Sequence, residues 1–193
     1  TMLHTDQHIL PINGIRDGLF TIAQALIDHS KQQPTIMIPN PFYPMYEGVS
    51  LLAKTKIHYL PVTSDTSFLP DFSQITEEEW QKCQLLYLSS PSNPHGKVIP
   101  PETWKFLLEK SNQYDFIIAA DECYSDLYMN ENAPPMGLLE ICAEINKEMR
   151  NCLVLHSLSK RSNVPGMRSG FIAGDEQLIA QLSSYRTYQG AAM

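Results

Sequence analysis

Phe116-Ile117-Ile118-Ala119-Ala120 is an uninterrupted apolar run, and it ends at a carboxylate, Asp121. A strand with one buried face alternates apolar and polar residues, whereas a strand covered on both faces is apolar throughout. The run therefore predicts a buried strand of a covered sheet. Asp121, directly after it, is expected to be largely buried and to need a partner charge.

Similar apolar runs alternate with helical patterns along the chain. Strands are predicted at residues 35–38, 56–62, 84–89, 116–120, 152–155 and 170–173. Helices are predicted at 14–30, 43–53, 100–108, 136–149 and 176–185. This alternation indicates an α/β fold, with a mostly parallel sheet covered by helices on both faces in three layers.

The composition narrows the classes of function. A chain of 193 residues fits one domain, and 14 Lys and Arg against 21 Asp and Glu give a net charge of −7. This balance argues against a nucleic-acid or anionic-membrane surface, so any bound anion needs a local site. No apolar run reaches the roughly 18 residues of a membrane span, and the start lacks a signal-peptide layout. A cytoplasmic protein is expected.

The cysteines and histidines show no metal-binding pattern. The four cysteines are far apart in sequence and form no CxxC pair, and the six histidines are scattered. We therefore expect reduced thiols, no disulfide framework and no metal site.

Three polar clusters follow predicted strands. They are Ser-Pro-Ser-Asn-Pro-His-Gly at 90–96, Asp-Glu-Cys-Tyr at 121–124, and the serine- and lysine-containing stretch 157–170. Ligands of open α/β sheets bind beyond the carboxyl ends of the strands. The three clusters are thus expected to form one site.

Lys160 is the candidate nucleophile of this site. An amine reacts at neutral pH when desolvation or a neighbouring cation lowers its pKa, although a solvated loop lysine would look the same in sequence. Ser157, Ser159 and Arg168 offer hydroxyl groups and a guanidinium that suit a phosphate dianion.

A second phosphate seat is possible before the first long helix. Gly14 permits close approach, and the backbone N–H groups of Ile15 and Arg16 are free to bind an anion at the helix start. A plain glycine turn is the alternative interpretation.

Four further side chains suit an aromatic, cationic ligand. Asp121 could pair with a ring nitrogen, Tyr124 and Asn93 could hydrogen-bond a phenolic oxygen, and Tyr43 could stack on a ring. Taken singly, they could be a capping aspartate, packed tyrosines and a turn asparagine. A reactive amine, a phosphate cradle, a carboxylate and two ring-oxygen donors together match pyridoxal phosphate, which is held as a Schiff base on lysine.

These residues lie in motifs that resemble the fold-type-I pyridoxal-phosphate aminotransferases of class I/II, most closely the bacterial N-succinyldiaminopimelate aminotransferases. The motifs are Asn-Gly-Ile-Arg-Asp-Gly-Leu-Phe (13–20), Pro-Asn-Pro-Phe-Tyr-Pro-Met-Tyr-Glu-Gly (39–48), Ser-Pro-Ser-Asn-Pro-His-Gly (90–96), Asp-Glu-Cys-Tyr-Ser (121–125), His-Ser-Leu-Ser-Lys-Arg-Ser-Asn-Val-Pro-Gly-Met-Arg-Ser-Gly-Phe (156–171) and Tyr-Arg-Thr-Tyr-Gln-Gly-Ala-Ala-Met (185–193). Ile15 and His95 stand where the family usually has threonine, and Asp17 where it usually has glutamate.

The resemblance implies a role for each candidate residue. Lys160 is the implied catalytic residue and cofactor anchor, and Asp121 the partner of the pyridinium nitrogen. The other implied cofactor-binding residues are Gly14, Ile15, Arg16, Tyr43, Asn93, Tyr124, Ser157 and Arg168.

The resemblance also implies an activity and a domain organisation. The implied reaction is transamination of N-succinyl-2-amino-6-oxopimelate with glutamate in lysine biosynthesis, in a homodimer acting on amino-acid and oxo-acid small molecules. Alternatives are an aspartate or aromatic aminotransferase, a pyridoxal-phosphate-dependent β-lyase, or a non-catalytic truncated domain. Residues 1–193 are expected to cover most of the cofactor-binding large domain, without an N-terminal segment or the C-terminal small domain. A loop such as 188–191 is expected to approach the partner subunit's phosphate.

Overall fold

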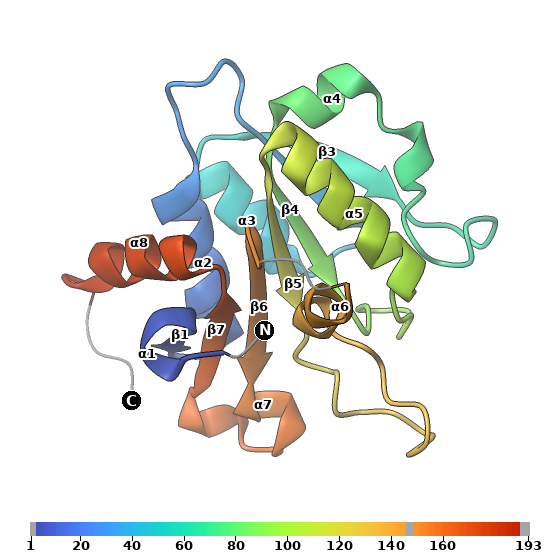
Figure 1. Cartoon of the computed structure of the whole chain (residues 1–193), viewed down its shortest axis with the longest axis vertical. Coiled ribbons are helices and arrows are strands. Elements are labelled where there is room, and N and C mark those ends of the chain that lie inside the picture. The colour runs from blue at the N-terminus through green and yellow to red at the C-terminus, as the bar shows by residue number, and fades with distance from the viewer. Residues whose placement is uncertain (1–2, 146–148, 190–193) are drawn as a thin grey trace.

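The computed structural model describes residues 3–145 and 149–189, which contain one seven-stranded sheet (Figure 1). The strands are β1 (Ile9–Ile12), β2 (Thr35–Asn40), β3 (Lys56–Pro61), β4 (Cys83–Ser89), β5 (Ile117–Asp121), β6 (Cys152–Ser157) and β7 (Gly170–Gly174), in the spatial order β1-β7-β6-β5-β4-β2-β3. The five from β6 to β3 are parallel, while β7 is antiparallel to both of its neighbours. The predicted mostly parallel sheet is confirmed.

Helices cover both faces of this sheet. The helical segments are α1 (Thr5–His8), α2 (Ile15–Leu26), α3 (Pro44–Leu52), η1 (Phe72–Gln74), α4 (Glu77–Lys82), α5 (Pro101–Tyr114), α6 (Leu138–Glu144), α7 (Leu158–Arg161), η2 (Pro165–Met167) and α8 (Glu176–Arg186). Buried side chains of α2, α3 and α8 form one apolar cluster against the sheet, and those of α4, α5 and α6 form another. The three layers predicted from the apolar runs are therefore present.

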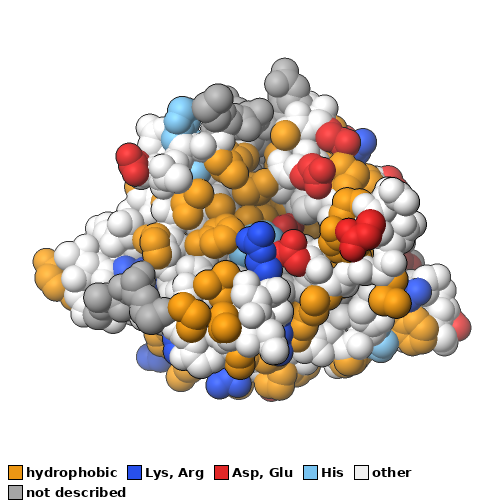
Figure 2. Space-filling model, turned by 90° about the horizontal axis from the view of Figure 1, so that it is seen from below, with side chains coloured by type: hydrophobic (Ala, Val, Ile, Leu, Met, Phe, Trp, Pro, Cys, Tyr) orange, Lys and Arg blue, Asp and Glu red, His pale blue; other side chains and the backbone are white. Residues whose placement is uncertain are grey.

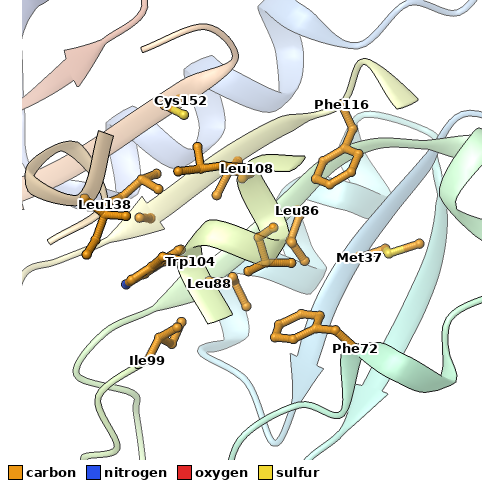
Figure 3. Close-up of a cluster of buried hydrophobic side chains, with 14 of the residues drawn as sticks. Met37, Phe72, Leu86, Leu88, Ile99, Trp104, Leu108, Phe116, Leu138 and Cys152 are labelled. Atoms are coloured by element: carbon orange, nitrogen blue, oxygen red, sulfur yellow. The ribbon is translucent and has the colours of Figure 1, made fainter. Parts of the chain in front are cut away.

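The central strand β5 explains why its sequence is apolar at every position. Ile117 and Ala119 face the cluster under α2, α3 and α8, whereas Ile118 and Ala120 face the other. Figure 3 shows the second cluster, in which Trp104 of α5 lies among side chains from several strands. Both faces of β5 are thus removed from water, and its carboxyl end is what remains open.

Three predicted helices have different bounds in the structure. The helix predicted at 14–30 ends at Leu26, where Ile27 adopts an extended conformation. The one predicted at 100–108 continues to Tyr114 and stops at Asp115, whose φ of 57° is left-handed. The one predicted at 136–149 covers only Leu138–Glu144, and residues 146–148 of that prediction lie outside the described residues.

Several short elements were not predicted. Strand β1 carries a proline and owes its place to antiparallel pairing with β7, which a local pattern does not reveal. Helix α4 begins with a capping box, in which Thr76 and Glu79 bind each other's backbone N–H groups. This Thr-x-x-Glu signal is visible in the sequence.

None of the described helices is long and apolar enough to cross a membrane.

The connection from β6 to β7 places Lys160 at the carboxyl end of the sheet. The N–H of Leu158 donates to the carbonyl oxygen of Ser169 at 3.1 Å and closes this connection at its base. A Cβ atom at Gly170 would collide with the carbonyl oxygen of His156, so this position requires glycine. In Figure 1, α7 lies beyond the end of β6.

Replacing Trp104 with alanine tests the packing of the core. Its side chain is fully buried, and its indole N–H has no hydrogen-bond partner among the described residues, so the loss is one of packing. We expect the free energy of unfolding in urea to fall by about 3–5 kcal/mol. The control Leu52→Ala, at a side chain that is 63% exposed, should change it by less than about 0.5 kcal/mol.

Candidate active site

A cavity of about 510 Å³ opens at the carboxyl ends of β4, β5 and β6. Figure 2 views the molecule from this end and shows basic and acidic side chains meeting near its middle among hydrophobic ones. The cavity brings together the candidates predicted from the sequence. Those that line it are Ile15, Arg16, Tyr43, Asn93, Asp121, Tyr124, Ser157, Lys160 and Arg168. The remaining candidate, Gly14, lies against Arg168.

Asp121 is a buried carboxylate of the cavity wall, with 4% of its surface exposed. The hydroxyl of Tyr46 donates to its Oδ2 at 3.2 Å, and the backbone N–H of Cys123 donates to its Oδ1 at 3.2 Å. None of the ion pairs among the described residues includes it. Burial is the largest effect and raises the pKa of Asp121.

Tyr46 was missed by the sequence analysis, although its position was readable. It lies three residues after Tyr43 in the helix predicted at 43–53, a spacing that predicts neighbouring side chains. In the structure Tyr43 is the N-cap of α3 and Tyr46 lies in its first turn. Its ring stacks on that of Tyr87, with centroids 5.2 Å apart, and meets the ring of Tyr43 edge-on at 5.8 Å. This packing fixes the hydroxyl that holds Asp121.

Lys160 lies at the mouth of the cavity, in the single turn of α7. Its Nζ is 5.6 Å from the centre of the Tyr124 ring. Both residues follow strand ends, β6 for Lys160 and β5 for Tyr124. Asn93 is exposed in the loop after β4, so the amine is bordered by groups from three neighbouring strands.

The guanidinium of Arg168 contacts the segment at the start of α2 and lines the cavity. Its Nη2 donates to the carbonyl oxygen of Asn13 at 3.2 Å, and its Nη1 donates to the carbonyl oxygen of Pro165 at 2.9 Å. Gly14, with a φ of 86°, lies so close that a Cβ atom there would collide with the guanidinium. The first N–H groups of α2 have no carbonyl partner within the helix, so they and Arg168 form one anion-attracting corner.

The two serines predicted to offer hydroxyl groups, Ser157 and Ser159, have different hydrogen-bond partners. Ser157 is buried, its Oγ accepts the N–H of Ser159 at 3.1 Å, and its hydroxyl donates to the carbonyl oxygen of Ser169 at 3.3 Å. Ser159 also lines the cavity, where its Oγ accepts from Nη1 of Arg168 at 3.4 Å. In this arrangement Ser157 caps α7 while Ser159 turns toward the guanidinium.

The residues present fit pyridoxal phosphate. The buried carboxylate of Asp121 forms no ion pair among the described residues, and a cationic ring nitrogen would compensate it. The corner between Gly14 and Arg168 suits a phosphate, and Lys160 supplies the amine. The cavity volume is also in the range typical of small-molecule sites, roughly 300–1,000 Å³.

No group of three or more possible metal ligands occurs among the described residues. Cys83, Cys123, Cys142 and Cys152 all lie in the described part of the chain, and none of them forms a disulfide there. Cys123 lines the cavity, and burial raises the pKa of its thiol.

Comparison with known proteins gives a family match over nearly the whole chain. The protein-family model described as aminotransferase class I and II matches residues 2–188 of this chain. A crystal structure of an aminotransferase from Neisseria meningitidis is 42% identical, with a TM-score of 0.94, and covers 100% of this chain and 49% of that chain.

Two further proteins extend the comparison. The LL-diaminopimelate aminotransferase of Maridesulfovibrio salexigens is 28% identical over 184 residues, covering 95% of this chain and 46% of the relative. A probable N-succinyldiaminopimelate aminotransferase from Thermus thermophilus, 24% identical with a TM-score of 0.86, covers 96% of this chain and 48% of that one. The last match shows a shared fold. The chain thus spans about half the length of the proteins it matches.

The raised pKa of Asp121 predicts how stability changes with pH in the absence of a ligand. Between the unfolded aspartate pKa of about 3.9 and the higher native value, the native state binds more protons. The free energy of unfolding therefore falls as pH rises through this window. Asp121→Asn removes this dependence, so the variant should gain stability relative to the wild type as the pH rises above about 4. A difference that does not change with pH in urea titrations would contradict the assignment.

Proposed function

Because this chain belongs to the class I and II aminotransferases, we propose that its protein transfers an amino group between an amino acid and an oxo acid, using pyridoxal 5′-phosphate. The observation that carries the proposal is the single cavity that unites Lys160, Asp121 and the corner between Gly14 and Arg168. Since the chain spans about half the length of its relatives, we propose that it supplies the cofactor-binding large domain.

Each part of the cavity has a proposed task. Lys160 holds the cofactor covalently, and Asp121 binds its ring nitrogen. The ring oxygen is bound by Asn93 and Tyr124, and the ring face by Tyr43. The phosphate is bound by Ser157, Arg168 and the start of α2, where Gly14 lets the backbone N–H groups of Ile15 and Arg16 approach.

The chemistry assigned to the chain's own residues is proton movement and charge stabilisation. When bound, pyridoxal phosphate supplies an electron sink for the charge that develops at the substrate α-carbon. The amine of Lys160, at the mouth of the cavity, would take the proton from that α-carbon as a general base. Asp121 stabilises positive charge on the ring nitrogen, and its burial strengthens this interaction because little water competes.

The proposed substrates are diaminopimelate-type compounds of lysine biosynthesis. Relatives are named LL-diaminopimelate aminotransferase, and the motifs of this chain resemble the N-succinyldiaminopimelate group. Both names contain the same diamino diacid skeleton. Within this class we propose N-succinyl-2-amino-6-oxopimelate as acceptor and glutamate as donor, with the unacylated diaminopimelate pair as the second candidate. A homodimer and a cytoplasmic location remain predictions from the resemblance and the composition.

Loss of the lysine amine tests the cofactor assignment. Wild-type protein mixed with pyridoxal phosphate should develop the visible absorption band of a lysine-bound cofactor, and Lys160→Ala should abolish that band while the free cofactor spectrum remains. Lys105→Ala, on the exposed surface of α5, is the matched control and should retain it. A band that persists in Lys160→Ala would refute the assignment.

The substrate proposal predicts a rank order of rates. With glutamate as donor, the rate of 2-oxoglutarate formation by the full-length protein should be highest with N-succinyl-2-amino-6-oxopimelate, measured as kcat/KM. The comparison acceptors are unacylated 2-amino-6-oxopimelate, oxaloacetate and an aromatic oxo acid. Preference for oxaloacetate or the aromatic acid would reassign the protein to another aminotransferase. Elimination from a β-substituted amino acid without amino transfer would indicate a β-lyase, and no turnover would favour the non-catalytic alternative.

A further inference from the structure

A part-buried ion pair joins the end of α8 to the first turn of α2, next to the proposed phosphate corner. Nη1 of Arg186, at the end of α8, donates to Oδ1 of Asp17, in the first turn of α2, at 2.8 Å. The side chain of Arg186 is 7% exposed and that of Asp17 is 26% exposed. The same Nη1 donates to the hydroxyl oxygen of Thr21 at 3.2 Å, so the guanidinium is tied to two positions of α2.

Asp17 in turn fixes the backbone of the corner. Its Oδ2 accepts the N–H of Asn13 at 2.8 Å, and the carbonyl oxygen of Asn13 accepts Nη2 of Arg168 at 3.2 Å. Gly14 and Ile15 follow directly. The chain of contacts therefore runs from α8 through Asp17 and the Asn13 backbone to the guanidinium in the cavity.

Arg186 both links two helices and compensates the negative charge of Asp17. A carboxylate in the first turn of α2 lies at the same helix end as the N–H groups of Ile15 and Arg16. Without compensation it would repel the phosphate dianion that these groups attract. Arg186 neutralises that carboxylate without lining the cavity itself.

We propose that Arg186 is a positioning residue for the cofactor phosphate: it neutralises Asp17, leaving that carboxylate to hold the Asn13 backbone without opposing the bound dianion. This inference rests on the proposed cofactor site. It also gives a task to part of the motif at 185–193, of which residues 190–193 lie outside the described residues.

The test separates the phosphate from the rest of the cofactor. Dissociation constants for pyridoxamine 5′-phosphate and for pyridoxamine, which lacks the phosphate, are measured by calorimetry on the full chain. Arg186→Met should weaken binding of the phosphorylated ligand about tenfold and leave that of pyridoxamine nearly unchanged. If this variant does not fold, Arg186→Gln replaces it with the same expectation, since it keeps a hydrogen-bonding group and removes the charge.

A double variant distinguishes charge compensation from packing. Asp17→Asn combined with Arg186→Met removes both charges and keeps an amide oxygen for the Asn13 N–H, so affinity for the phosphorylated ligand should return to within about threefold of the wild type. Arg150→Met is the control, because Arg150 pairs with Asp115 at 2.8 Å at the opposite end of the sheet. It should change neither constant.

Two sets of results overturn the inference differently. If the wild type prefers the phosphorylated ligand but Arg186→Met has no effect, weakens both ligands equally, or is not rescued by the double variant, the positioning role is wrong and the cofactor site stands. If the wild type shows no preference for the phosphorylated ligand, the proposed phosphate corner fails and the inference fails with it.

Discussion

A carboxylate at the end of an apolar strand loses its hydration, and Asp121 recovers only part of it from the Tyr46 hydroxyl and the Cys123 amide. The layers that bury β5 are the same layers that desolvate this side chain, because helices cover both faces and leave only the strand end open. The packing that stabilises the core therefore also sets the environment of the Asp121 carboxylate. A cation bound in the cavity would be attracted strongly to the Asp121 carboxylate, because little water is present to screen the two charges.

The rest of the cavity is assembled from segments that are distant in sequence. Arg168 and the carbonyl of Asn13 are 155 positions apart, yet they meet because β6, β7 and β1 are neighbours in the sheet. The antiparallel strand β7 lies between the other two, and its first residue, Gly170, pairs with Ser157 at the end of β6 and with Ile12 at the end of β1. Parallel pairing creates the common edge, and the reversal at β7 closes one side of it.

The sequence was most informative where one local pattern decides the structure. The apolar runs predicted all central strands and their layers, since a strand covered on both faces has no other pattern. Strand β1 was out of reach because its pairing with β7 is non-local, whereas Thr76 and Glu79 of α4 carried a readable capping signal that was passed over. In the site, strand-end rules located the cavity. They could not reveal which oxygen faces which donor. The contact of Tyr46 with Asp121, and the different partners of Ser157 and Ser159, are visible only in the folded structure.

The chain carries a net charge of −7 and yet forms a corner suited to a dianion, which shows how local the electrostatics must be. The net negative charge of the whole molecule repels an anion at long range, but at physiological ionic strength this repulsion is screened beyond about 8 Å. What remains is the field of the nearest groups: the cavity-lining cations Arg16, Lys160 and Arg168, the first N–H groups of α2 and any carboxylate among them. Asp17 is such a carboxylate, and it pairs with Arg186. In the proposed site this pairing offsets a charge that would oppose a phosphate at that helix end. Binding of an anion by an acidic protein therefore depends on neutralising the few acidic groups that share its site, while the many elsewhere have little effect.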